Sequence, residues 1–96
     1  MSGRPMRLHE AGPVTVSTEH YTVEVESHRW LSVSTGRYSR MFSARLAGAG
    51  TWQASSSLRG AIARAVGIGR SRRSLQLRSL ERDARVELEA ARERVR

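Results

Sequence analysis

Arginine is the residue type that gives this sequence most of its chemistry. All seventeen basic residues are arginine, nine residues are acidic, and the net charge is +8. A guanidinium group stays charged and donates several hydrogen bonds in one plane, so it suits phosphate and carboxylate groups. A GC-rich genome, whose codons favour arginine over lysine, would also explain the choice of residue. The net charge attracts polyanions in either case.

The positive charge is concentrated in the middle of the chain. Residues 1–28 hold two arginines and four glutamates, residues 29–73 hold nine arginines and no acidic residue, and residues 74–96 hold six arginines and five acidic residues. A solvated protein surface usually mixes both signs. Forty-five consecutive residues without a carboxylate therefore indicate a surface that faces a polyanion.

The sequence does not indicate a catalytic or metal site. His9, His20 and His28 stand on a predicted arm or at predicted strand ends, and none is close in the chain to Asp83, the one aspartate. There is no cysteine, and Glu26 with His28 is the only pair whose spacing loosely suits a metal. We therefore expect solvated histidines and a protein that is not an enzyme and uses no cofactor.

Alternating apolar and polar residues predict an α+β fold with a small antiparallel sheet of three strands. In YTVEVES, residues 21–27, every second residue is apolar or aromatic. RWLSVSTG, residues 29–36, and RYSRMFSARLAG, residues 37–48, follow as two more strands. VTVST, residues 14–18, is either the start of the first strand or a short strand of its own.

Gly36 marks the hairpin between the last two of these strands. A β-branched residue precedes it, which favours a type I turn with a glycine bulge over a type I′ turn. The strand register remains undetermined by one residue. Because a shift of one residue moves each side chain to the other face, the faces of Arg37, Arg40 and Arg45 are also undetermined. Trp30 and Met41 are expected to face each other on the side away from the first helix, either as a stabilising pair or as a platform for a base.

A first helix is predicted between a serine-rich N-cap at residues 55–57 and a glycine C-cap at Gly67 or Gly69. Trp52, in the preceding loop, is expected to cap the core. The apolar residues with helical spacing, which should pack on the sheet, are Leu58, Ala61, Ile62, Ala65 and Val66.

A second helix is predicted from about Arg72 or Ser74 to the end of the chain. Its apolar residues fall within an arc of roughly 80°. So narrow a stripe suits docking on a neighbour or pairing with a second copy of the chain, so we expect a homodimer through this helix. The stripe consists of Leu77, Leu80, Ala84, Leu88, Ala91 and Val95.

The segment between the helices, AIARAVGIGRS at residues 61–71, is similar to the first half of a helix-turn-helix. The resemblance places Ala63 at the helix crossing and Gly67 at the turn, and it implies a second helix that reads DNA. The second half departs from the pattern, because Arg73 and Gln76 stand where the motif has apolar residues. The alternative, which we favour, is a glycine hinge followed by arginines that coat the start of the next helix.

These patterns divide the chain into a flexible arm at residues 1–13, a small α+β domain at residues 14–69, and a C-terminal amphipathic helix at residues 70–96. Proline and glycine interrupt the arm. Since the sequence has no apolar run of membrane length and no pattern of a secretory signal, we expect a soluble, cytoplasmic protein that contacts no membrane.

The function that we expect is nucleic-acid binding, with DNA as the partner rather than RNA. A small regulator from a phage or mobile element would fit this chemistry. The alternative is an interaction or assembly module that self-associates or binds an acidic protein through its last helix. The expected phosphate contacts come from Arg37, Arg40, Arg45, Arg59, Arg64, Arg70, Arg72 and Arg73.

Overall fold

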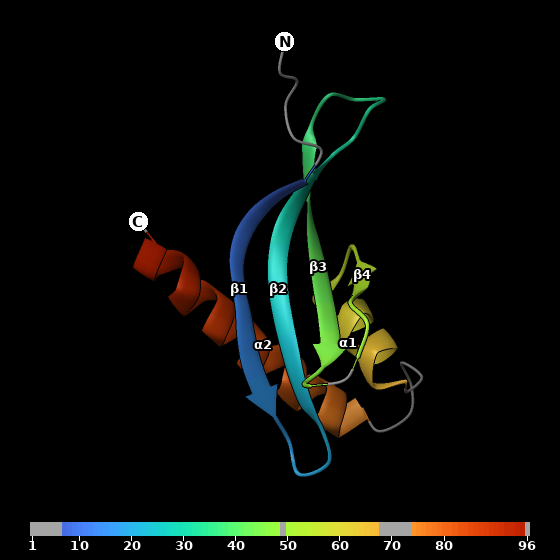
Figure 1. Ribbon diagram of the computed structural model, residues 1–96, viewed down its shortest axis with the longest axis vertical. Helices are drawn as coiled ribbons and strands as arrows, with labels where there is room; N and C mark the ends of the chain where they lie inside the picture. The colour runs from blue at the N-terminus through green and yellow to red at the C-terminus, as the bar shows by residue number, and fades with distance from the viewer. Residues whose placement is uncertain (1–6, 49, 68–73, 96) are drawn as a thin grey trace.

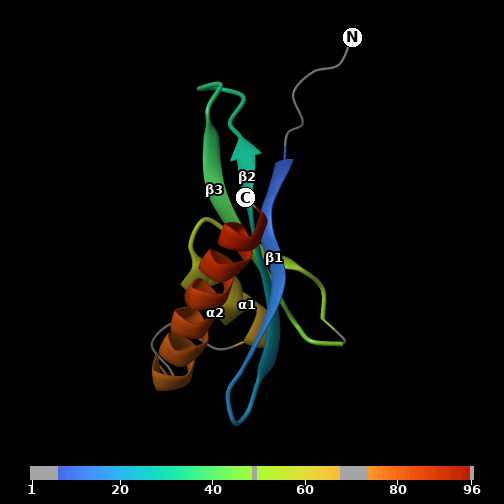
Figure 2. The ribbon, with the colours of Figure 1, turned by 90° about the vertical axis from the view of Figure 1, so that its left-hand side faces the viewer.

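The computed structural model describes residues 7–48, 50–67 and 74–95. They form a four-stranded antiparallel sheet in the order β1-β2-β3-β4, followed by two helices that lie on the same side of the sheet (Figures 1 and 2). The predicted α+β fold is confirmed, with four strands rather than three. The elements are β1 (Arg7–Ser17), β2 (Thr22–Leu31), β3 (Tyr38–Leu46), β4 (Gln53–Ser55), α1 (Leu58–Val66) and α2 (Ser74–Val95).

Two of the three predicted strands are one, since β2 continues from residues 22–27 into residues 29–31 and the rest of RWLSVSTG lies in the hairpin loop. The additional strands are β1 and the three-residue β4, and β1 corrects the prediction of a flexible arm for residues 7–13, whereas residues 1–6 lie outside the described residues. Residues 7–13 are the first half of this strand, and VTVST is its second half. The pairing of β1 with β2 shifts register on both sides of Ala11. Gly12 has φ +99°, and a Cβ there would come within 2.7 Å of the Val25 carbonyl oxygen. Because β1 is an edge strand, Pro13 is tolerated although it cannot donate to a neighbour.

The hairpin between β2 and β3 turns at Gly36, as predicted, with φ +68°. The Gly36 N–H donates to the Ser32 carbonyl and the Ser32 N–H donates to the Arg37 carbonyl, both at 2.8 Å. The loop therefore spans four residues and closes with an i to i+4 bond rather than the i to i+3 bond of the expected type I turn. The register pairs Arg29 with Arg40 and settles which face each hairpin arginine occupies.

One apolar core lies between the sheet and the two helices. Val23 and Val25 of β2 and Ala44 of β3 are fully buried, and they face Ile62 of α1. The part of the core that α2 contributes is the stripe that we expected to be available for self-association. It is instead buried inside the chain, where α2 packs on β1 and α1, and its buried residues are Leu77, Leu80, Ala84 and Leu88.

The end of this stripe is less enclosed. Ala91 is partly buried against the core, and the side chain of Val95 lies outside the described residues. The last helix therefore shares its core with the preceding domain, whereas we had expected a partly independent element.

Both ends of α1 follow the prediction. Ser57 is the N-cap and its hydroxyl accepts from the Gly60 N–H at 3.0 Å. Gly67 is the C-cap with φ +72°, and its N–H donates to the Ala63 carbonyl. The second helix is described from Ser74, and its apolar side covers the sheet. Residues 68–73, on which both the helix-turn-helix resemblance and the favoured glycine hinge depend, lie outside the described residues.

Candidate nucleic-acid interface

Glu10 of β1 lies at the centre of a cluster of arginines on the helix side of the sheet. Its carboxylate accepts from Arg29 Nε at 3.1 Å and lies 3.2 Å from Arg40 Nε. A guanidinium nitrogen of Arg92, from α2, lies 3.5 Å away. The Glu10 side chain is only 13% exposed. Burial raises the pKa of this carboxyl, but Arg29, Arg40 and Arg92 outweigh burial and hold the pKa below its ordinary value.

The bulge in β1 explains why Glu10 reaches this position. The register shift between His9 and Ala11 leaves Glu10 without a cross-strand partner. Arg29 and Arg40 are direct partners across β2 and β3, and like charges in that arrangement repel each other. The carboxylate offsets this repulsion, but one negative charge serves three guanidinium groups.

The hairpin between β2 and β3 protrudes beyond both helices (Figure 1). Arg37 is exposed at the start of β3, and within the described residues no acidic side chain pairs with it. Trp30 is 44% exposed and lies on the opposite face of the hairpin from Arg29. The hairpin therefore presents Arg29 and Arg40 on the helix side and Trp30 on the other side, which is also the side that alternation from Tyr38 gives to Arg37.

A second set of arginines continues the cluster along α2. Glu81 accepts from Arg59 of α1 at 3.0 Å and from Arg85 at 3.0 Å. Arg85 then lines a cavity of about 30 Å³ together with Arg40 and Arg92. The Nε atom of Arg92 is buried there without a hydrogen-bond acceptor from the described residues. An unpaired buried donor is unfavourable, so this site favours an added acceptor such as an oxyanion.

We call this set of residues the basic surface. It contains more arginines than glutamates, which leaves three positive charges uncompensated. Its continuity, apart from Arg37 at the end of the hairpin, follows from the shared carboxylates of Glu10 and Glu81 and from the cavity between β3 and α2. Its members are Arg29, Arg37, Arg40, Arg59, Arg85 and Arg92, with Glu10, Glu81 and Glu89.

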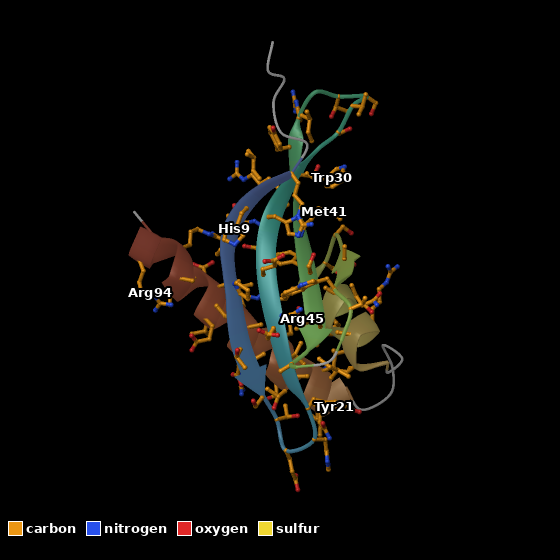
Figure 3. All side chains as sticks on the ribbon, viewed as in Figure 1. His9, Tyr21, Trp30, Met41, Arg45 and Arg94 are labelled. Carbon is orange, nitrogen blue, oxygen red and sulfur yellow. The ribbon has the colours of Figure 1, made fainter. Side chains whose placement is uncertain are left out.

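The basic surface contains only part of the predicted set. Arg37, Arg40 and Arg59 belong to it. Arg45 lies on the opposite face of the sheet, where Glu24 pairs with it at 2.9 Å (Figure 3). Its guanidinium stacks 4.6 Å from the Trp52 ring centre, so the prediction that Trp52 caps the core is wrong. The other predicted contacts are Arg64, which donates to the Ala54 carbonyl, and Arg70, Arg72 and Arg73, which lie outside the described residues.

Sequence reasoning missed Arg85 and Arg92, and it did not connect either to the hairpin. Both belong to an arginine-rich side of the last helix, which was visible in the sequence. Their relation to Arg29 and Arg40 depends on where α2 crosses the sheet, and helical periodicity does not carry that information.

The face of the sheet without a helix carries Trp30, Met41 and His28. Trp30 and Met41 lie on it, as predicted, although Met41 pairs directly with His28 and not with Trp30 (Figure 3). His28 is 3% exposed, and its Nε2 lies 2.8 Å from the Ser43 hydroxyl. The prediction of solvated histidines is therefore wrong for His28. Burial lowers the pKa of this imidazole, and the nearby Arg7 lowers it further.

Comparison of the chain with models of known families, with curated proteins and with solved structures finds no match. Across the described ranges, no three histidine and acidic side chains gather in a group suited to a metal ion. None of the helices described is both long enough and apolar enough to cross a membrane.

Proposed function

We propose that this protein binds nucleic acid without acting as an enzyme, and that the basic surface contacts the phosphates. The observation that carries the proposal is the sharing of one largely buried carboxylate, that of Glu10, among Arg29, Arg40 and Arg92. Positive charge that the chain itself does not neutralise attracts polyanions, and the phosphate backbone is the polyanion with a regular spacing of charges.

The shape of the molecule supports duplex DNA as the partner. The basic surface runs from the start of α1 along α2 to a hairpin that protrudes beyond both helices. A two-stranded ribbon is narrow enough to enter the major groove of B-form DNA. In this arrangement Arg37, near the end of the hairpin, reaches furthest into the groove. Arg85 and Arg92 of α2 contact the phosphate backbone of the DNA.

The test is a titration of labelled duplex and single-stranded DNA at about 50 and 200 mM salt. We expect binding to the duplex that weakens steeply between the two salt concentrations. The variant is the double substitution Arg37→Gln and Arg85→Gln on the basic surface. It should lower the affinity and reduce the salt slope by roughly one for each arginine that no longer neutralises a phosphate.

The matched control is the double substitution Arg64→Gln and Arg94→Gln, which removes the same charge from exposed positions outside the basic surface. This control variant should retain most of the wild-type affinity for the duplex and most of its salt dependence. Absence of binding at the lower salt concentration would refute the proposed function. An equal decrease in affinity for the two double variants would refute the assignment to the basic surface.

A further inference from the structure

A second apolar stripe runs along α2 on the side away from the core. Leu75 is 77% exposed and Val86 is 62% exposed, and Ser79 lies between them at helical spacing. At about 100° per residue these three positions fall within roughly 40° of one another, opposite the buried leucines. They line one shallow groove along the helix, together with Arg82.

The charges beside this stripe have opposite signs at its two ends. On one flank of the stripe the exposed ionic residues are basic toward the start of the helix and acidic toward its end, whereas Asp83, Glu87 and Arg94 lie on the other flank. A stripe of this kind has a positive end and a negative end. The basic residues of this flank are Arg78, Arg82 and Arg85, and its acidic residues are Glu89 and Glu93.

We propose that the outer face of α2 pairs with the same face of a second copy of the chain in an antiparallel orientation. An antiparallel pair brings the basic half of each helix against the acidic half of the other. The pattern is thus complementary to itself, which is what a two-fold contact requires.

The register follows from the positions of the charges around Val86. With the two-fold axis between Arg85 and Val86, Arg82 lies opposite Glu89 of the second copy, and the two valines meet beside the axis, offset by one residue. Both side chains are available for this contact, since Arg82 is 74% exposed and Glu89 is 62% exposed. Their contacts within the chain are weak, at 3.3 Å between Arg82 and Asp83 and 4.0 Å between Glu89 and Arg92.

Space beside the helix also permits the contact. A shallow groove separates Val86 and Glu87 from residues 15–17 at the end of β1, so the side chains of a second helix have room on that side. The 22 residues of α2 span about 33 Å, which makes this a small contact and a dimer that dissociates on dilution. The two sheets would lie on the outside, with their helices between them.

The test uses sedimentation equilibrium of the full chain without nucleic acid, at loading concentrations from about 10 to 500 µM. We expect the mass to rise from monomer to dimer with concentration. Val86→Glu should hold the mass at that of the monomer, since it buries two like charges beside the axis. Val33→Glu, at a position on the hairpin that is 84% exposed, is the matched control and should dimerise normally.

Charge exchange tests the antiparallel register. Arg82→Glu and Glu89→Arg should each weaken the dimer at least tenfold, and the double variant should restore it. Arg94→Glu, on another side of the same helix, should have little effect. A wild-type protein that stays monomeric throughout the range would overturn the proposal, and so would a double variant that is no stronger than the single ones. Because no nucleic acid is present, either result leaves the proposed function untouched.

Discussion

Replacing Glu10 with glutamine should make the protein less stable and, at the same time, a better binder of DNA. The substitution keeps the size of the side chain and removes the one negative charge that Arg29, Arg40 and Arg92 share. Stability falls because three guanidinium groups then repel one another without a counter-charge. The affinity for DNA rises because the net positive charge of the basic surface increases from three to four.

The size of the loss in stability follows from the solvent exposure of the three arginines. The side chains of Arg29, Arg40 and Arg92 are 55%, 44% and 27% exposed, so each ion pair contributes about 0.2–1 kcal/mol after solvent screening. Two effects offset part of this loss. Glutamine still accepts hydrogen bonds from the arginines, and the variant has no carboxylate whose burial costs desolvation energy. We therefore expect a decrease of about 1–2 kcal/mol in the free energy of unfolding, where 1 kcal/mol corresponds to roughly 4–8 °C in Tm.

The pH dependence separates this mechanism from a general packing defect. The folded protein holds the pKa of Glu10 below its ordinary value of 4.5. Its stabilising contribution is therefore complete above about pH 4.5 and disappears as the pH falls through the lower pKa of the folded state. Urea unfolding of both proteins, followed by circular dichroism, should give a difference that is constant from pH 7 to 5 and shrinks in stronger acid. A difference that persists unchanged at pH 3, or a variant as stable as wild type at pH 7, would refute the reasoning.

Two further predictions concern the folded state. Because burial lowers the pKa of His28, the unfolded chain takes up a proton more readily, and the free energy of unfolding should fall as the pH drops below 6.5. His28→Gln should reduce that fall and His20→Gln should not; equal pH profiles for wild type and His28→Gln would contradict the assignment. Leu80→Ala should cost about 2–5 kcal/mol in urea unfolding, because this side chain is fully buried. Val33→Ala, at an exposed position, should cost less than about 0.5 kcal/mol, and a similar cost for both would show that α2 does not form part of the core.

Local sequence signals predicted the elements with clear periodicity or clear caps. The alternation in residues 21–27, the serines before Leu58 and the glycine at position 67 each predicted a feature that the structure has. These signals work because a strand period, an N-cap and a left-handed C-cap depend on neighbours in the chain. The hairpin at Gly36 belongs to the same class.

The first half of β1 was missed because its signal depends on position in the sheet. Gly12 and Pro13 usually interrupt regular structure, but an edge strand accepts a proline, and the bulge needs a glycine close to the β2 backbone. Without this strand Glu10 has no defined place. The arginine cluster therefore could not be assembled from the sequence.

The role of α2 was predicted only in part. The stripe containing Leu77, Leu80 and Leu88 was found from its spacing, but periodicity does not say which surface a stripe covers. The structure places it on the chain's own sheet and leaves Leu75 and Val86 exposed on the other side. The partner surface depends on long-range packing that no local pattern encodes.

The shortness of β4 has a consequence for how the hairpin moves. Its three residues pair only with Phe42 to Ala44 of β3, so among the residues described β3 has no second neighbour from Tyr38 to Met41. Backbone amides with one neighbouring strand and no covering helix open at a lower free energy than those of a sheet interior. Hydrogen exchange should therefore be fastest in this half of the hairpin. A segment that opens so readily adjusts its curvature to a partner at little energetic cost, while the shared core keeps the rest of the sheet rigid.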